Sequence, residues 1–220
     1  MKNPIQPSLK TEIIPLTLIV LSFIASIYFY LHFPEKVPTH WNIRGEVDGY
    51  ASKGFGAFFF PIMNVGIYLL LLFLPNIDPK KDRYVDFSKA YHMIKNFMIG
   101  FMTLIYFYTG FSGLGYKLFS ITIIISIGLG LLFLVIGNYM GKVKSNWFIG
   151  IRTPWTLSNE EVWNKTHRMG GKVFVIMGLI MFTGVFLPAE IFFAIMIITT
   201  LIGSMIPIIY SYMLYKKLTK

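Results

Sequence analysis

A short polar segment at residues 38–50 gathers side chains that can act as acids, bases and ligands. One imidazole, two carboxylates and one guanidinium fall within ten residues, interrupted by two glycines that permit tight turns. An imidazole beside a carboxylate suits acid–base chemistry, and three such groups suit a metal, although no spacing here matches a known metal motif. The segment also fits a rigid recognition loop, or a plain turn held by an Arg44–carboxylate pair. The candidate binding residues are His40, Trp41, Asn42, Arg44, Gly45, Glu46, Asp48 and Gly49.

A second cluster lies in the long polar stretch near residues 137–172. It holds three of the four tryptophans, with Arg152 among them. A planar guanidinium near indole rings can bind an anionic or peptide group, meet lipid phosphates, or stack internally. Part of the tryptophan content also fits an aromatic belt at the headgroups. The candidate binding or output residues are Asn138, Lys144, Asn146, Trp147, Arg152, Thr153, Pro154, Trp155, Glu161, Trp163, His167 and Arg168.

Local signals divide this stretch. Pro154 excludes a regular helix through that point. Ser158 with Glu161 has the spacing of a capping box, which predicts that a helix starts there, and Glu161 with Lys165 suits an i,i+4 ion pair. We expect an amphipathic helix that lies in the membrane interface before the fifth span. The pair Gly170-Gly171 predicts either a hinge or a close helix contact.

The elements that position both clusters are long apolar blocks. Apolar residues make up 55% of the 220 residues and charged residues only 14%, too few for a water-facing surface. About 20 apolar residues in a helix span the bilayer core. We therefore predict an all-α integral membrane protein, a bundle of about six transmembrane helices plus the interfacial helix. The spans are expected at residues 12–33, 55–74, 91–111, 118–140, 172–187 and 191–215.

The third span is the weakest of the six, because polar residues occupy its first turns. We expect Lys95 there to extend toward the headgroups. Asn64, in the second span, is expected to bond a neighbouring helix. The organisation predicted is a two-span unit at residues 1–75, a connecting loop with span three at 76–117, and a three-span unit at 118–220.

Lysine and arginine counts predict the orientation. Sixteen of these residues fall on the side of the two termini and four on the side of the 38–50 segment. Cytoplasmic loops carry the excess of positive charge, so both termini are expected in the cytoplasm of a multi-pass protein of the cell membrane. The same rule, with attraction to anionic lipid, accounts for the net charge of +10 better than nucleic-acid binding does.

Several classes of function lose support. The chain has no cysteine, which excludes disulfides and thiol catalysis, and no phosphate-loop, serine-hydrolase or zinc-protease motif. No cofactor and no metal are implied, and no catalytic residue is assigned. An enzyme acting on lipid or peptide stays open, with His40 and Asp48, or His167 and a neighbouring glutamate, as its groups. A peptide transporter and a purely structural module also stay open.

The two clusters carry a family resemblance. The motifs Pro-x-His-Trp-Asn and Gly-Glu-x-Asp-Gly-Tyr resemble a small uncharacterised domain, over about residues 15–65, that often precedes SdpI-like domains. The inner run Asn-Trp-Phe-x-Gly-Ile-Arg-Thr-Pro-Trp-Thr-Leu resembles the SdpI family, over about residues 118–190. The resemblance implies an immunity protein against a secreted toxin peptide of the sporulation-delaying kind. It also implies that some members hold a cytoplasmic transcriptional repressor at the membrane.

Overall fold

The computed structural model describes residues 3–116 and 119–219. Helices dominate this part of the chain, with one two-stranded antiparallel sheet. The elements in chain order are α1 (Leu9–His32), β1 (Lys36–Trp41), β2 (Val47–Ser52), α2 (Lys53–Ile77), the 3₁₀ helix η1 (Lys81–Phe87), α3 (Ser88–Gly113), α4 (Ile121–Met140), α5 (Pro154–Ser158), α6 (Glu160–Met181), the 3₁₀ helix η2 (Phe182–Val185) and α7 (Ala189–Leu218).

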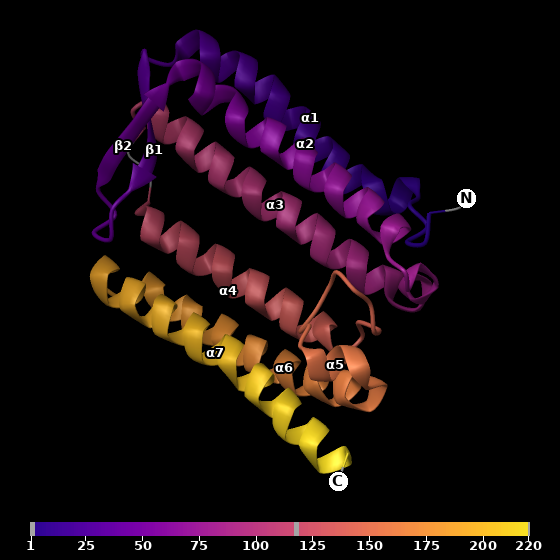
Figure 1. Ribbon diagram of the computed structural model, residues 1–220. Coiled ribbons are helices and arrows are strands. Elements are labelled where there is room, and N and C mark those ends of the chain that lie inside the picture. Colours follow the sequence, from indigo (N-terminus) through magenta and orange to yellow (C-terminus); the bar gives the residue numbers. More distant parts are fainter. Residues whose placement is uncertain (1–2, 117–118, 220) are drawn as a thin grey trace.

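The long helices form two groups that meet along α3 and α4. Helices α1, α2 and α3 pack on one another, while α6 packs between α4 and α7 (Figure 1). The β-hairpin lies at one end of the bundle, and η1 and α5 lie at the other (Figure 1). The two polar clusters of the sequence therefore occupy opposite ends of the molecule.

The membrane class predicted from the sequence is confirmed. Within the described residues, five helices are long and apolar enough to cross a bilayer: α1, α2, α4, α6 with its η2 extension, and α7. The sixth expected crossing, α3, has 26 residues, which at about 1.5 Å each exceed the ~30 Å core. Its hydropathy is lower because His92, Lys95 and Asn96 lie in its first half, so this crossing stays a prediction.

The fifth span differs from the expected one in its start. Helix α6 is continuous from Glu160, so the expected interfacial helix and the span are a single element. Its first turns are buried in the protein through Val162, Trp163 and Thr166 rather than lying on lipid. The predicted cap was wrong by one residue, since the side chain of Asn159, not Ser158, accepts the N–H groups of residues 161 and 162. The predicted Glu161–Lys165 pair is present at 2.6 Å.

Glycines allow α4 and α6 to approach closely. A Cβ added to Gly171 would lie 2.6 Å from the carbonyl oxygen of Gly137, and one added to Gly178 would lie 2.7 Å from that of Gly130. Gly171 and Gly178 on α6 are seven residues apart, as are Gly130 and Gly137 on α4. The two contacts therefore lie on one face of each helix, about two turns apart. The close helix contact predicted for Gly170-Gly171, rather than the hinge, is therefore confirmed.

Two polar residues within the spans bond neighbouring helices. The Asn64 amide donates to Thr103 Oγ1 at 3.1 Å, which confirms the predicted packing role. The prediction for Lys95 was wrong. Its side chain is fully buried and its ammonium lies 2.5 Å from a carboxylate oxygen of Glu12, because α1 supplies an acidic partner that removes the need to reach water.

Candidate functional site

The polar segment at residues 38–50 lies in a β-hairpin, which the sequence did not predict. Strands β1 and β2 pair antiparallel, with irregular register near His40. The turn is closed by Asn42, whose side-chain oxygen accepts the N–H groups of Arg44 and Glu46 at 2.9 and 3.1 Å. Gly45 has φ +76, a left-handed conformation that glycine adopts without strain. Asn42 and Gly45 therefore shape the turn.

A surface ion pair completes the turn. Arg44 Nε lies 3.2 Å from Glu46 Oε2, and the Asn42 amide donates to the same oxygen at 3.1 Å. These bonds, that of Asn42 first, lower the pKa of the Glu46 carboxyl. The arrangement matches the simple turn held by an Arg44–carboxylate pair. It also removes Glu46 from a metal set with His40 and Asp48, and no group of three such ligands occurs in residues 3–116 and 119–219.

His40 and Asp48 face each other across the two strands. His40 Nδ1 lies 2.5 Å from Asp48 Oδ1, and the side chains are 70% and 44% exposed. Gly49 allows this approach, because a Cβ there would lie 2.7 Å from the Cβ of His40. The sequence-predicted pair is thus brought together. Its exposure to water suits ligand binding better than acid–base catalysis, which gains from a water-excluded site.

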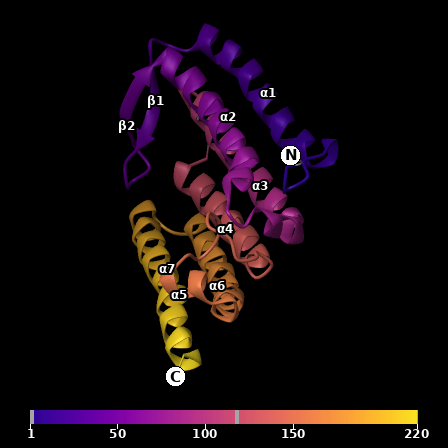
Figure 2. The ribbon, with the colours of Figure 1, turned by 45° about the vertical axis from the view of Figure 1, so that its right-hand side comes forward.

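The hairpin forms one wall of a groove. The turn packs on the start of α4, since an added Cβ on Gly45 would lie 3.4 Å from Thr122 Oγ1. Both ribbon views place the hairpin turn beside the first turns of α4 and α7 (Figures 1 and 2). Between them lies a groove of about 450 Å³. Its lining residues are His40, Trp41, Asn42, Ile43, Asp48, Ile121, Thr122, Ile125, Ala189, Phe192, Phe193 and Met196.

At the other end of the bundle, Asp78 holds the loop between α4 and α5 (residues 141–153, here called the inner loop) to the N-terminal group, which consists of α1, α2 and α3. This carboxylate is 2% exposed and accepts from the N–H of Trp147 and from the Tyr84 hydroxyl, both at 2.9 Å. Burial, followed by the bond to Asp78, raises the pKa of Tyr84 above its ordinary value. No sequence motif marks Asp78, and its only local signal is an acidic residue that follows an apolar block.

Two further contacts join the same parts. Lys80 Nζ donates to Ser145 Oγ at 2.7 Å, and Arg83 pairs with Glu160 at 2.7 Å. With Asp78, these residues form what we call the inner latch: Asp78, Lys80, Arg83 and Tyr84 on one side, and Ser145, Trp147 and Glu160 on the other. The inner latch fixes the loop against η1 and thereby links the two helix groups at this end.

Three residues of the predicted inner set are buried and bonded within the protein. Asn146 accepts the N–H groups of residues 148 and 149 and donates to two backbone carbonyls. Trp163 donates through its indole nitrogen to Val143 O at 2.8 Å. The His167 ring stacks on the Trp163 ring, with the ring centroids 4.0 Å apart. Its Nδ1 is bonded to Trp163 O, and its Nε2 accepts the N–H of Ile151. These contacts give the three residues a positioning role in the loop.

The buried histidine bears on the possibility of an enzyme. Both ring nitrogens of His167 are engaged, Glu160 pairs with Arg83, and Glu161 pairs with Lys165. Each group of the inner acid–base set therefore has a bonding partner within the described part of the chain, and both glutamates remain exposed at the surface.

Other residues of the predicted inner set fasten the loop to α7. Thr153 caps α5, accepting from Thr156 N at 3.2 Å, and its hydroxyl lies 3.0 Å from Ser211 Oγ. Pro154 is the first residue of α5, and the ring centroids of Trp155 and Tyr212 lie 5.0 Å apart. The structure thus brings Thr153, Pro154 and Trp155 together against α7.

The remaining members of the inner set lie at or near the surface. Arg152 is exposed and donates to the backbone oxygen of Trp147 at 2.5 Å, and Trp147 is itself 46% exposed. Asn138 and Arg168 are exposed, and Lys144 is half-buried. Arg152 and Trp147 are therefore both exposed at this end, and the guanidinium is held to the Trp147 backbone.

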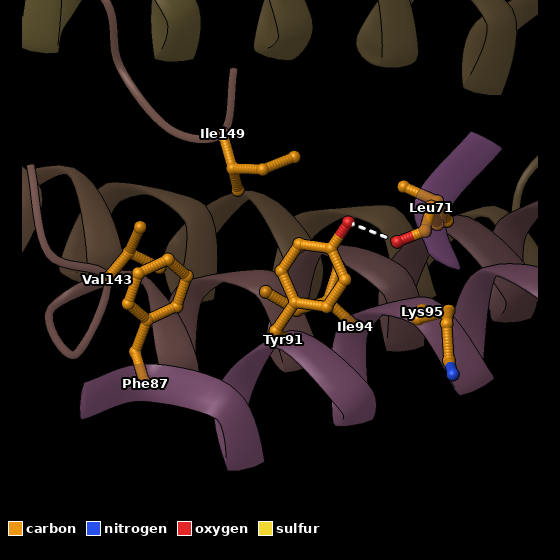
Figure 3. A pocket seen from close by; sticks show the side chains of 7 residues that line it. All are labelled: Leu71, Phe87, Tyr91, Ile94, Lys95, Val143 and Ile149. Carbon is orange, nitrogen blue, oxygen red and sulfur yellow. Dashed lines mark hydrogen bonds between the residues drawn. The ribbon is translucent and has the colours of Figure 1, made fainter. Parts of the chain in front are cut away.

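A small cavity lies beneath the inner loop (Figure 3). It has about 20 Å³ and is walled mainly by apolar groups, among them Leu71, Phe87 and Val143. The hydroxyl of Tyr91, which also lines the cavity, already donates to Leu71 O at 2.6 Å. The Lys95 ammonium is directed away from the Tyr91 ring (Figure 3). The cavity therefore offers no polar group to a ligand.

Comparison with known proteins places both clusters in described families. Residues 142–211 match the SdpI/YfhL protein family, and residues 17–65 match a domain of unknown function, DUF1648. The chain is 32% identical over 210 residues to Immunity protein SdpI of Bacillus subtilis (strain 168), covering 96% of this chain and 98% of that protein. The chain belongs to the SdpI family. This confirms the resemblance carried by the two motifs, and no solved structure matches the chain.

The family match divides the groove in an informative way. The hairpin residues lie within the DUF1648 match, while Phe192, Phe193 and Met196 lie within the SdpI/YfhL match. In this SdpI family member, the two matched regions therefore line one groove, together with Ile121, Thr122 and Ile125 of α4, which lie outside both matches.

Proposed function

We propose that this chain is a membrane immunity protein that protects its cell against a secreted antimicrobial peptide. The observation that carries the proposal is the similarity to Immunity protein SdpI, which extends over 96% of the chain. Similarity of this extent includes both polar clusters and the helices that position them. The multi-pass helical structure supports a protein that acts within the membrane.

In this proposal the hairpin faces the outside and the termini lie in the cytoplasm. The lysine and arginine distribution, sixteen against four, supports that orientation. A secreted peptide would then meet the exposed His40–Asp48 pair and the neighbouring Trp41 first. Indole rings contribute strongly to peptide recognition because they bury a large area at a low cost in conformational entropy.

Survival of a sensitive bacterial strain tests the proposal. The strain expresses the chain and is exposed to a toxin of the sporulation-delaying type, beside an empty-vector strain and a Trp41→Ala strain at matched membrane levels. We expect the wild-type chain to raise survival and Trp41→Ala to lower it again. Tyr50→Ala is the control, because Tyr50 is exposed on the same hairpin but lies outside the groove. Survival equal to the empty vector in the wild-type strain would contradict the proposal.

A second candidate function is signalling through the inner end. The supporting observation is the exposed Trp147–Arg152 surface, fixed by Asp78. A cytoplasmic transcriptional repressor of the kind that the family resemblance implies would bind there when toxin is present. A fluorescent fusion of such a repressor should move to the membrane with the wild-type chain and stay in the cytoplasm with Arg152→Ala. Equal recruitment by both chains, at equal membrane levels, would refute this second function.

A further inference from the structure

The groove between the hairpin and helices α4 and α7 has two walls of different chemistry. The helix wall is mainly apolar, with Ile121 and Ile125 on α4 and Phe193 and Met196 on α7, and Thr122 is its one polar side chain among the lining residues. The hairpin wall adds polar groups beside Trp41. At about 450 Å³ the groove has the size of a small-molecule or side-chain binding pocket. An occupant that satisfies both walls must itself be amphipathic.

The hairpin wall keeps bonding capacity for such an occupant. The His40–Asp48 contact uses Nδ1 of the imidazole and Oδ1 of the carboxylate. Among the described residues, none bonds His40 Nε2 or Asp48 Oδ2, while the Asn42 oxygen serves the turn. A carboxylate oxygen accepts bonds, so it favours an N–H or a cationic group. The groove thus combines a mainly apolar helix wall with a hydrogen-bond acceptor, Asp48 Oδ2, on the hairpin wall.

We infer that this groove is the peptide-binding site, and that the secreted peptide inserts an apolar segment against α4 and α7 while a basic or N–H group reaches Asp48. This inference deepens the proposed function and rests on it. The hairpin supplies one wall of the site, and this gives the DUF1648-matched region a role in recognition. A lipid chain would match the apolar part of the helix wall but would make no bond to Asp48, whose side chain is 44% exposed and would stay hydrated.

The position of the groove fits a peptide that arrives from outside and partitions into the membrane. The groove lies at the first turns of α4 and α7, where the helices emerge beside the hairpin (Figure 2). Apolar side chains of the peptide can therefore enter without crossing the bundle. Apolar side chains that enter the groove from water lose their contact with water there, which favours binding.

Matched tryptophan substitutions test the groove directly. Met196→Trp fills it, whereas Ile197→Trp places the same ring on the next residue of α7, which is 42% exposed and does not line the groove. Ile125→Trp with Ile127→Trp gives a second pair on α4, in case Met196→Trp fails to reach the membrane. We expect the filling variants to lower survival under toxin by about tenfold or more and the controls to match the wild type. Asp48→Asn should also lower survival, less strongly.

The outcomes separate this inference from the function on which it rests. Protection by the wild-type chain, with protection undiminished in Met196→Trp and Ile125→Trp at equal membrane levels, overturns the groove as the site and leaves the immunity function standing. Full protection by Asp48→Asn with loss in the filling variants overturns the polar contact and points to a purely apolar occupant. No protection by the wild-type chain overturns both.

Discussion

The Lys95 ammonium lies 2.5 Å from Glu12 Oε2, joining α3 to α1 across 83 residues of sequence. Tyr68 on α2 donates to the same carboxylate oxygen at 3.0 Å, and His92 Nδ1 lies 3.4 Å from the other oxygen. One acidic side chain therefore connects three helices of the N-terminal group. Since the lysine side chain is fully buried, each charge depends on the other for its compensation.

Removing one member of this pair should destabilise the protein severely. Lys95→Met leaves Glu12 buried without its cation, and such losses cost about 3–5 kcal/mol. We expect a lower unfolding free energy in detergent, measured by denaturant titration. The double variant Glu12→Gln with Lys95→Met removes both charges and should recover much of the loss. A Lys95→Met protein as stable as the wild type would show that the pair contributes nothing.

Features of the fold that depend on neighbouring residues could be predicted from the sequence, and features that depend on residues far apart in the chain could not. The apolar runs of α1, α2, α4 and α7 are local and are set by the bilayer thickness, so their existence could be predicted. The Glu12–Lys95 contact could not, because its partners are far apart in sequence and either one alone reads as a residue near a helix end. The hairpin was missed because Gly45 and Gly49 suggested a loop, although Val47, Gly49 and Ala51 alternate in burial with their neighbours.

The candidate site shows the same limit. The motifs identified Trp41, His40 and Asp48 on the hairpin, and the resemblance identified the family. The opposite wall of the groove consists of ordinary apolar residues, such as Ile125 and Met196, that no motif distinguishes from lipid-facing ones. Only the packing of the hairpin turn against α4 reveals that these residues share a cavity with the hairpin.

The inner latch gives a second prediction, at Asp78. Asp78→Ala leaves the Trp147 N–H and the Tyr84 hydroxyl without their acceptor in a buried place, at a cost of roughly 1–3 kcal/mol. We expect the loop to open more often, so trypsin should cleave at Lys144 faster than in the wild type. Asp82→Ala is the control, because Asp82 is exposed on the adjoining η1. Equal cleavage rates for the two variants would argue against the latch.

The glycine contact between α4 and α6 gives a third prediction. Gly171→Ala places a methyl group 2.6 Å from a backbone oxygen that cannot rotate away. Such overpacking costs about 1–3 kcal/mol, more than the gain of about 1 kcal/mol from the better helix former. The melting temperature in detergent should fall. Gly66→Ala, which meets nothing within 4 Å, should leave it unchanged or raise it; a drop of the same size in both variants would rule out a specific contact.

The orientation can be tested cleanly because the chain has no cysteine of its own. Single cysteines at Arg44 and Lys144 lie at opposite ends of the bundle, in the hairpin turn and the inner loop. In intact cells, a membrane-impermeant thiol reagent should label Arg44→Cys and spare Lys144→Cys. Labelling of Lys144→Cys alone would invert the orientation, and with it the assignment of the groove to the outside.

Direct binding tests the central claim, that the protein confers immunity by capturing the peptide itself. The purified chain, reconstituted in lipid nanodiscs, would be titrated with a fluorescently labelled toxin of the sporulation-delaying type. We predict saturable binding to the wild type and to Ile197→Trp, and binding at least about tenfold weaker to Met196→Trp. A wild-type chain that protects cells yet binds no toxin in the nanodiscs would contradict the account.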